Sequence, residues 1–454
     1  MSLFHAATKT PRLGTARIET RNDGLQRQPL KLLRGVTFQG LMPGNNLQSL
    51  VGEVNTGKRP NIQLLREKHL DAESVIEPRL LKPVKVLGEG AFGIVFMCEY
   101  IPRIGSSTEE LVHAAGGFVA MKKLKVKLPP VSDGNPMATP VVLSVVEQRM
   151  ADDRELADFA SELLMLKALK HPNVIGYIGC TLQKDADGND QLAIVQEYAA
   201  HGTLKPLLTA ETSVLRRKYT TADGLRWAHH IASGMAFLHD CRPPIIHRDL
   251  KPENILLCGD RATAKIADFG LVTFEKRDMR GDNFKVTGIV GSMRYMSPEN
   301  FRGENYSRKN DVYSFAIICY ELLLRQRAYE GLFMSTEEIA KRAGANELRP
   351  ALPSVWPPEA KSLHSRCWAH EPSKRPEFSE VATELAAWRT DGAQNVLKGV
   401  VKGSKKGLLE VFGFGNAMLH TSFSDTTEQR ASKRMSGSRA SSFGDGTQRR
   451  FSIA

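Results

Sequence analysis

Residues 245–270 read IIHRDLKPENILLCGDRATAKIADFG, and this stretch decides how the rest of the chain is interpreted. It brings two carboxylates, a lysine and a carboxamide into one short segment, as Asp249, Lys251, Asn254 and Asp268. A carboxylate that accepts a hydroxyl proton, a cation and two metal-binding oxygen ligands are the groups needed to move a phosphoryl group from a magnesium-bound nucleotide to an alcohol. A surface turn rich in Asp and Asn would use the same residue types to cap neighbouring helices.

The order of these residues favours phosphoryl transfer, because the strings HRDLKPEN (247–254) and DFG (268–270) resemble the catalytic loop and the metal loop of the eukaryotic protein kinase family. The resemblance implies that Asp249 is the general base, which orients the substrate hydroxyl, and that Lys251 reaches the transferred phosphate. It implies that Asn254 and Asp268 hold Mg²⁺, and that the cofactors are ATP and Mg²⁺. Since the transition state is loose, such groups act mainly by positioning and charge neutralisation.

A glycine-rich stretch, LGEGAFGIV at 87–95, supplies a second phosphate-handling pattern. Glycine lets the backbone approach phosphates without a Cβ in the way, but the spacing G-x-G-x-x-G also fits a dinucleotide-binding turn. That turn needs a helix directly after the third glycine, whereas the following IVFMCEYI (94–101) is β-branched and aromatic and predicts a strand. We therefore expect a hairpin, and the resemblance assigns nucleotide contacts to Leu87, Gly88, Glu89, Gly90, Ala91, Phe92, Gly93 and Val95.

The segment FVAMKKL at 118–124 resembles the V-A-x-K strand of the same family. The resemblance implies that Lys122 holds the α- and β-phosphates of ATP, whereas Lys123 beside it is an ordinary strand lysine. Apolar residues with a helical period predict a helix within 151–170. Glu162 has the spacing from the following HPNVI that is typical of helix C in the family, so we expect it to orient Lys122 through an ion pair.

Residues 193–204, AIVQEYAAHGTL, combine a buried strand with a polar turn and resemble the hinge between two kinase lobes. The resemblance implies that backbone groups of Glu197 and Ala199 bind the adenine edge of ATP. It also implies that Ala120 and Leu256 enclose the adenine ring.

The segment 268–299 resembles an activation segment that closes at MSPE (296–299), a variant of A-P-E. A phosphate on one of its hydroxyls would order the segment through an arginine, for which Arg248 is the candidate. We expect an upstream kinase to act on Thr287. Ser292 is expected close to the catalytic base.

Two further contacts are implied within the large lobe. Asp311, near the start of the apolar helix NDVYSFAIICYELLL (310–324), is expected to bond back to the catalytic loop. Arg375, in the string KRPEF, is expected to pair with Glu299.

At 454 residues and 41% hydrophobic composition, the chain can bury a large core. Its six cysteines are scattered without the spacing of a metal site, which favours free thiols in a reducing compartment. No apolar run approaches about 20 residues, and the N-terminus lacks the apolar core of a secretory signal. We expect a cytoplasmic protein, with access to the nucleus left open and no stable membrane insertion.

The net charge of +12 lies mostly at the ends of the chain. The first 50 residues carry +5 and residues 391–454 another +5, which leaves +2 for the region between them. Because the centre is nearly neutral, no nucleic-acid partner is expected. The ends lack a helical or strand period and predict disorder. Basic residues before three tail serines resemble sites for other kinases, namely at Ser436, Ser442 and Ser452.

Together these patterns predict an α+β fold of two lobes flanked by disordered tails. The small lobe is expected to be mainly antiparallel β with helix C, and the larger lobe mainly helical. Two enlarged loops are expected in the small lobe, around GSSTEE (105–110) and LPPVSDGNPMATP (128–140). The expected divisions are an N-terminal extension at 1–79, a catalytic domain at 80–390 with lobes at about 80–196 and 200–390, and a basic, serine-rich tail at 391–454.

The resemblance implies an ATP-dependent protein serine/threonine kinase that acts on protein substrates in intracellular signalling. Lys251 within L-K-P-E-N is typical of serine/threonine kinases, and DVYSF (311–315) with the later Cys-Trp and Arg-Pro pairs resembles the tyrosine-kinase-like branch. A dual-specificity or tyrosine kinase is the enzymatic alternative. A pseudokinase scaffold usually lacks a catalytic Lys, Asp or Asn, and none is missing here. Binding of nucleic acid by the basic tails is the non-enzymatic alternative.

Overall fold

The computed structural model describes most of the expected catalytic domain, all of it within the unit Asn46–Ala454. The described residues are 70, 72–90, 93–102, 106, 108–124, 158–184, 190–209, 219–275, 291–305 and 307–389. The predictions for 1–69, 128–140 and 391–454, for Thr287 and for the three tail serines lie outside them.

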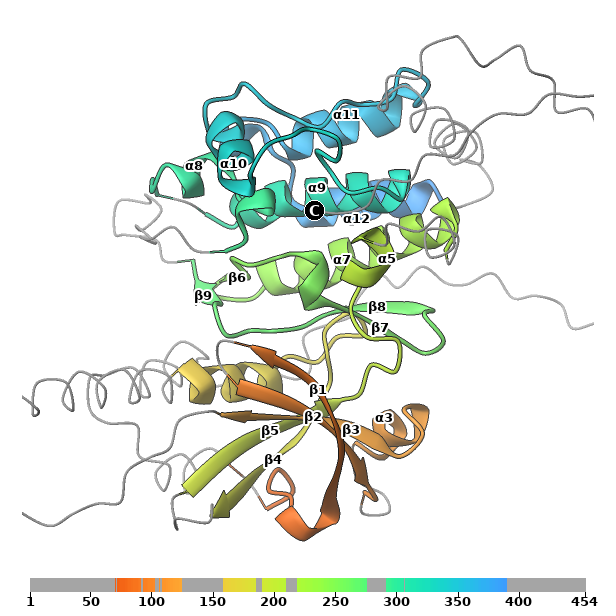
Figure 1. Cartoon of the computed structure of the whole chain (residues 1–454), viewed down its shortest axis with the longest axis vertical. Coiled ribbons are helices and arrows are strands. Elements are labelled where there is room, and N and C mark those ends of the chain that lie inside the picture. Colours follow the sequence, from red (N-terminus) through yellow and green to blue (C-terminus); the bar gives the residue numbers. More distant parts are fainter. Residues whose placement is uncertain are drawn as a thin grey trace, which may run out of the picture. The chain divides into compact units, whose positions relative to one another are not determined.

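The small lobe is built on one antiparallel sheet with strand order β1-β2-β3-β5-β4 (Figure 1). Side chains alternate across β3, so Val119 and Met121 enter the lobe core while Ala120 and Lys122 face the opposite side. The enlarged loop expected at 105–110 leads into helix α3 (Glu109–Ala114), which adds Val112 to that core. The strands are β1 (Leu81–Gly90), β2 (Gly93–Tyr100), β3 (Phe118–Leu124), β4 (Tyr177–Lys184) and β5 (Asp190–Glu197).

A helix at 158–168 takes the place predicted for helix C. Its buried apolar residues recur with helical spacing at Phe159, Leu163 and Leu166. Because this face is buried against the lobe, Glu162, next to Leu163, is also removed from solvent.

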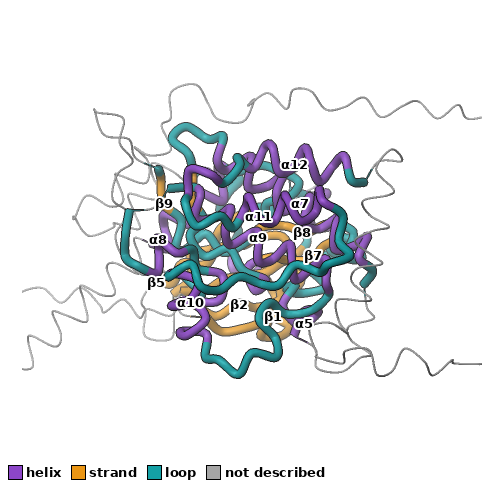
Figure 2. The backbone as a smooth tube through the Cα atoms, turned by 90° about the horizontal axis from the view of Figure 1, so that it is seen from above, coloured by secondary structure: helices purple, strands orange, loops and turns teal. Residues whose placement is uncertain are grey.

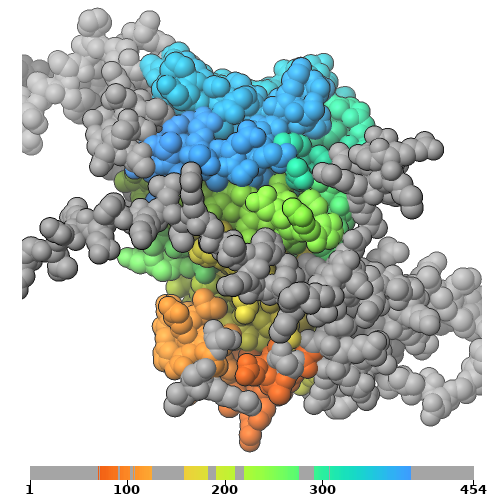
Figure 3. All heavy atoms as spheres, turned by 180° about the vertical axis from the view of Figure 1, so that it is seen from behind, coloured from red at the N-terminus to blue at the C-terminus, as the bar shows by residue number. Residues whose placement is uncertain are grey.

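The large lobe is mainly helical and is organised around α9 (Lys309–Leu324), whose residues from Asn310 onward are all buried. A helix with buried side chains on all sides belongs inside a lobe. Helix α7 (Thr221–His239) lies beside α9 (Figure 2), and α12 (Phe378–Ala387) packs on α7, as the blue and yellow-green surfaces in Figure 3 show. The other helices are α5 (Lys205–Thr209), α8 (Pro298–Phe301), α10 (Thr336–Gly344) and α11 (Pro358–Cys367), with 3₁₀ turns η1 (Pro78–Leu80), η2 (Pro252–Asn254), η3 (Met293–Tyr295) and η4 (Pro372–Lys374). Among the described helices, none combines the length and the apolar character needed to cross a bilayer.

The stretch 245–270 folds with its surroundings into two short antiparallel pairs. Strand β7 (Ile255–Cys258) pairs with β8 (Thr263–Ile266), and β6 (Ile245–Ile246) pairs with β9 (Thr273–Phe274). These pairs hold the catalytic loop and the DFG segment side by side. The predicted fold class, an antiparallel small lobe and a helical large lobe, is confirmed.

Asp311 fastens the catalytic loop to α9. Its carboxylate accepts hydrogen bonds from the backbone N–H groups of His247 at 2.8 Å and Arg248 at 2.9 Å. Nε2 of His239, at the end of α7, lies 3.0 Å from the same carboxylate. The predicted bond from Asp311 to the catalytic loop is therefore confirmed.

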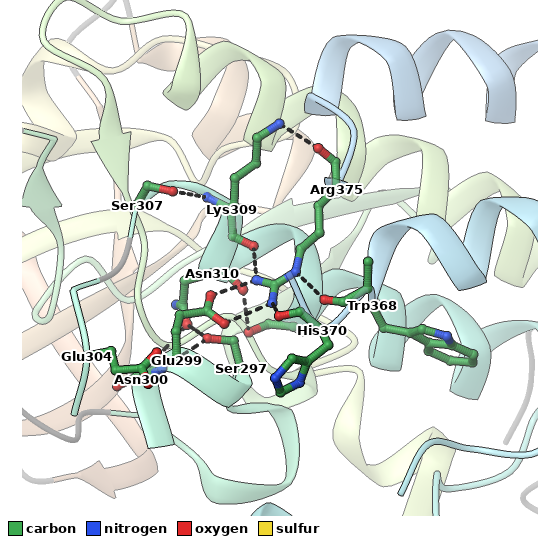
Figure 4. A network of polar contacts seen from close by, with 12 residues as sticks. Ser297, Glu299, Asn300, Glu304, Ser307, Lys309, Asn310, Trp368, His370 and Arg375 are labelled. Carbon is green, nitrogen blue, oxygen red and sulfur yellow. Dashed lines mark hydrogen bonds and ion pairs between the residues drawn. The ribbon is translucent and has the colours of Figure 1, made fainter. Parts of the chain in front are cut away.

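Arg375 and Glu299 form a fully buried ion pair beneath α9 (Figure 4). The two guanidinium Nη atoms donate to the two carboxylate oxygens at 2.6 and 2.8 Å, which confirms the predicted pair. The remaining donors of Arg375 bind carbonyl oxygens of Ala369, His370 and Lys309. Because all its donors are engaged, this arginine ties the end of the activation segment to the C-terminal part of the lobe.

Replacing Arg375 with Met should destabilise the large lobe strongly, because Glu299 would remain buried without a counter-charge. We expect a loss of about 3–5 kcal/mol in the free energy of unfolding, measured by urea denaturation. Arg342→Gln, which removes the same charge from an exposed pair with Glu338, should leave the midpoint unchanged. Equal losses of stability in the two variants would contradict the structural role assigned to the buried pair of Arg375 and Glu299.

Candidate active site

Lys122 lies at the centre of charged contacts that join the two lobes. Its Nζ atom is 2.7 Å from both carboxylate oxygens of Glu162 and 3.2 Å from Oδ1 of Asp268. These partners lie 40 and 146 residues away in the sequence. Only 11% of the Lys122 side chain and 3% of the Glu162 side chain are exposed. The fold thus brings together three residues that the resemblance groups.

Lys122 and Asp268 keep each other ionised. Burial by itself lowers the pKa of the Lys122 ammonium group, but Glu162 and Asp268 outweigh it and raise this pKa. Burial raises the pKa of the Asp268 carboxyl, and Lys122 outweighs that effect and holds it below its ordinary value. The pKa of Glu162 is raised by burial, and Lys122 opposes this shift. A cation therefore lies beside a carboxylate that is still 40% exposed.

Asp249 is held from three sides in the catalytic loop. Nζ of Lys251 donates to its Oδ2 at 2.5 Å, and the carboxamide nitrogen of Asn254 donates to its backbone oxygen at 2.9 Å. The backbone N–H and the hydroxyl of Ser292 lie 3.1 and 3.3 Å from its Oδ1. Ser292 is expected close to Asp249, and this is where it lies. These contacts fix the direction in which the carboxylate can meet a substrate hydroxyl.

The close approach to Asp249 depends on Gly291. This residue has φ = 109°, in the region that favours glycine. A Cβ atom on it would lie 2.8 Å from the carbonyl oxygen of Arg248 and 3.5 Å from Oδ1 of Asp249. Any side chain here would push the segment 291–292 away from the catalytic carboxylate.

Asn254 and Asp268 are the residues that fit a magnesium ion. The backbone N–H of Ala267 donates to the carbonyl oxygen of Asn254 at 2.9 Å, so the two candidate ligands come from adjacent backbone. Carboxylate and carboxamide oxygens are ligands that Mg²⁺ prefers, with water and phosphate supplying the others. Among the described residues no cluster of three or more His, Cys, Asp or Glu could hold a metal by itself, so this pair would need phosphate oxygens to complete the shell.

The glycine-rich segment forms the predicted hairpin instead of a dinucleotide-binding turn. In the register of β1 and β2, Gly88 pairs with Val95 and Gly90 with Gly93, and Leu87 and Glu89 lie within β1. Ala91 and Phe92 lie outside the described residues. Gly93 has a packing role that the sequence did not reveal: a Cβ on it would lie 2.3 Å from the carbonyl oxygen of Lys123 on β3.

The hinge begins at Glu197, the last residue of β5. Ala120 on β3 pairs in register with Gln196, and Leu256 on β7 bridges to Thr203 after the hinge. The backbone N–H of Glu197 donates to the carbonyl oxygen of Gly176 at 2.8 Å, so it cannot bind a nucleotide at the same time. The carbonyl oxygen of Ala199 accepts from Gly202. The Glu197 carbonyl and the Ala199 N–H are therefore the candidates for binding the adenine edge.

Sequence reasoning missed what the Glu197 side chain does. Its Oε2 atom lies 2.6 Å from Nζ of Lys265 on β8 and accepts a hydrogen bond from the N–H of Gly176. This nearly buried pair links the hinge to the segment that carries Asp268. No local signal identifies Lys265, because its partner is 68 residues away.

Tyr295 anchors the loop that contacts Asp249 onto α9. Its hydroxyl donates to Oε2 of Glu321 at 3.1 Å, and its carbonyl oxygen accepts from the hydroxyl of Ser314 at 2.8 Å. The other oxygen of Glu321 accepts from the N–H of Ala328 at 2.8 Å. Burial raises the pKa of the Glu321 carboxyl to about 7. This anchor is therefore only partly ionised at neutral pH.

Comparison with known proteins identifies the domain that carries these contacts. Residues 81–385 match the family described as protein tyrosine and serine/threonine kinase. The serine/threonine-protein kinase VIK of Arabidopsis thaliana is 34% identical over 250 residues, which are 54% of this chain and 54% of VIK.

Other relatives carry different kinase names. The dual specificity protein kinase shkB of Dictyostelium discoideum is 32% identical over 251 residues, 54% of this chain and 36% of shkB. The human mitogen-activated protein kinase kinase kinase 7 is 33% identical over 238 residues, 52% of this chain and 36% of that protein. The match thus spans about half the length of VIK and roughly a third of the other two.

Gly291→Ala should destabilise the protein more than Gly303→Ala. Both glycines have positive φ, but a Cβ on Gly303 would meet no atom within 4 Å. We expect a loss of about 1–2 kcal/mol at Gly303 from backbone strain, and roughly 1–3 kcal/mol more at Gly291 from the collision with Arg248. Chemical denaturation of the two variants measures the difference, and similar losses would disprove the collision.

Glu321 should make stability fall as pH rises toward neutrality. Its pKa in the fold, about 7, exceeds the value of about 4.3 in an unfolded chain. Its stabilising contribution is therefore complete below pH ~4 and is lost by pH ~8. Relative to Glu321→Gln, the free energy of unfolding of the wild type should fall by about 4 kcal/mol between these limits. A difference that stays constant from pH ~5 to ~8 would show that Glu321 does not titrate in this range.

Proposed function

Because the chain belongs to the protein tyrosine and serine/threonine kinase family, we propose that it transfers the γ-phosphate of Mg-ATP to serine and threonine hydroxyls of protein substrates in intracellular signalling. The observation that carries this proposal is the convergence of Lys122, Glu162 and Asp268 at one point of the cleft. A cation and an exposed carboxylate side by side suit a phosphate chain and its metal ion.

On this proposal Lys122 binds the α- and β-phosphates, and Glu162 keeps it directed into the cleft. The adenine edge is bound by the Glu197 carbonyl and the Ala199 N–H. The remaining nucleotide contacts are assigned to Leu87, Gly88, Glu89, Gly90, Ala91, Phe92, Gly93, Val95, Ala120 and Leu256.

Asp249 is proposed to orient the substrate hydroxyl and accept its proton. Its contacts with Asn254 and Ser292 support this role, because they fix the carboxylate before substrate arrives. Lys251, 2.5 Å from Asp249, would stabilise the negative charge of the transferred phosphoryl group. Asn254 and Asp268 would hold Mg²⁺, which supplies charge neutralisation on the phosphates when bound.

Serine and threonine are proposed as the acceptor residues. Lys251 in the catalytic loop and the similarity to VIK, a serine/threonine-protein kinase, support this assignment. The similarity to shkB, a dual specificity protein kinase, favours phosphorylation of tyrosine as a second candidate activity. Phosphoamino-acid analysis of the autophosphorylated protein separates the two, since phosphotyrosine would appear only with dual specificity.

Regulation is proposed to act through the activation segment and the tail. An upstream kinase would modify Thr287, and Arg248 would receive the phosphate. Contacts on both sides of Thr287 support a regulatory switch at this residue. Before it, Glu275 pairs with Arg308 at 3.2 Å, and after it, Ser292 contacts Asp249. Ser436, Ser442 and Ser452 are proposed as further sites for an upstream kinase.

We propose a cytoplasmic location, with access to the nucleus left open. All six cysteines are free and buried, which supports a reducing compartment. We place the catalytic domain at 80–390, between an N-terminal extension and a basic tail. The family match at 81–385 supports these limits.

The function can be tested with Lys122→Met and Asp249→Asn. Each should lower the rate of phosphate transfer to a generic phosphoacceptor protein by about 10²–10³-fold, because each removes one preorganised charge from the site. Labelled ATP with the full-length chain gives the rate directly.

Lys123→Met is the matched control. It removes the same charge from the next residue of β3, whose side chain alternates to the other face. Lys123 is half-buried on the face opposite to Lys122, so transfer by this variant should stay within about twofold of wild type. Wild-type protein that transfers no more phosphate than Asp249→Asn would overturn the proposed function in favour of a scaffold.

A further inference from the structure

Two arginines meet beside the loop that contacts Asp249. Arg294 belongs to η3, and its Nη1 atom donates a hydrogen bond to the carbonyl oxygen of Ala328. Arg327 directly precedes Ala328, so both guanidinium groups belong to one short turn after α9 and the loop packed on it. Burial, and after it the charge of Arg327, lowers the pKa of Arg294, which is consistent with two cations held close together.

The protein itself does not satisfy these two arginines. In both, the Nε atom is buried and has no hydrogen-bond partner. Arg327 forms neither a side-chain hydrogen bond nor a salt bridge with any residue of the described ranges. Arg375 in the same lobe differs, because all its donors bind Glu299 or carbonyl oxygens. The Nη atoms of Arg327 have no partner among the described residues either, but they are not buried, so they are open to a partner from outside.

Two of the nearby acids, Glu321 and Glu253, are already engaged by other groups. Glu321 uses its two oxygens for the N–H of Ala328 and the hydroxyl of Tyr295. Because burial raises its pKa to about 7, it neutralises the arginines only in part. Glu253 in η2 pairs with Lys205 at 2.9 Å. The loop therefore presents an excess of positive charge.

This positive charge lies within reach of a substrate chain. Arg294 is two residues from Ser292, whose hydroxyl is 3.3 Å from Oδ1 of Asp249. Two residues of backbone and the arginine side chain set an upper limit, so the guanidinium group lies within about 15 Å of the Asp249 carboxylate. An extended peptide advances about 3.3 Å per residue. A residue roughly three to five positions from the acceptor hydroxyl would reach it.

We propose that Arg294 and Arg327 form a subsite for an anionic side chain of the protein substrate, either a carboxylate or a phosphate, a few residues from the acceptor hydroxyl. The proposal rests on the kinase function proposed above and adds a substrate class to it. The guanidinium forks suit both anions, because they offer parallel N–H donors to two oxygens. Substrates with basic residues at the same position would be disfavoured by repulsion.

The test uses the full-length chain and a positional peptide library with a central serine. Each flanking position is fixed in turn as Asp, Asn, Lys or phosphoserine, and kcat/KM is compared between peptides for one enzyme. We expect one position at which Asp is preferred over Asn by about tenfold, the effect of one charge-assisted hydrogen bond. In Arg327→Gln this ratio should fall toward one. In Arg327→Glu the preference should invert in favour of Lys.

The phosphoserine peptides separate the two sources of anion. A preference for phosphoserine well above Asp would identify previously phosphorylated substrates, since phosphate carries about −1.5 to −2 charge. Equal preference for phosphoserine and Asp would identify substrates with acidic sequences. Either result supports the subsite.

Arg79→Gln is the control, because it removes the same charge from an exposed side chain in the small lobe, and its Asp to Asn ratio should match wild type. Ratios near one at every position, or ratios unchanged in Arg327→Glu, would overturn the subsite while leaving the kinase function intact. Absence of transfer to any peptide or generic protein would instead overturn the function.

Discussion

A buried carboxylate on the central helix fixes the backbone on which the catalytic groups stand. Asp311 is fully buried, and its oxygens are bonded by the N–H groups of His247 and Arg248 and contacted by His239. Because an unpaired buried charge is strongly unfavourable, the loop cannot leave this position without a large cost. The contact also retains Arg248 at φ = 69°, a conformation that costs about 1–2 kcal/mol for a residue with a side chain. Asp249, the next residue, is thereby directed to the cleft.

Two ion pairs connect the small lobe to the segment around β8, and they differ in what they do. Lys122 contacts both Glu162 and Asp268, so its charge stabilises the fold and is also available to bind a ligand. Glu197 and Lys265 are nearly buried and join the hinge to β8. Since a buried pair adds little net stability after its desolvation, the main effect of both pairs is to hold the lobes in one relative position.

The arginines of the large lobe show how the same side chain serves structure or recognition. Arg375 has every donor engaged by Glu299 and by backbone oxygens, and it is fully buried. Arg327 has no such partner and is only partly buried. Saturation of the guanidinium group marks a structural role, whereas the unsaturated guanidinium of Arg327 is the one proposed to meet a substrate.

The sequence by itself determined the fold class and named the residues of the cleft. Short strings such as HRDLKPEN and DFG place chemically distinctive groups at fixed spacing, so Lys122, Glu162 and Asp268 could be nominated before any contact was known. Only the tertiary structure decided which groups meet across long separations. The pairing of Glu197 with Lys265, the packing of Gly93 against β3, and the hydrogen bond from Arg294 to Ala328 all join segments whose local sequences carry no sign of each other. The physical reason is that such contacts depend on how strands and helices pack, which local propensity and spacing do not encode.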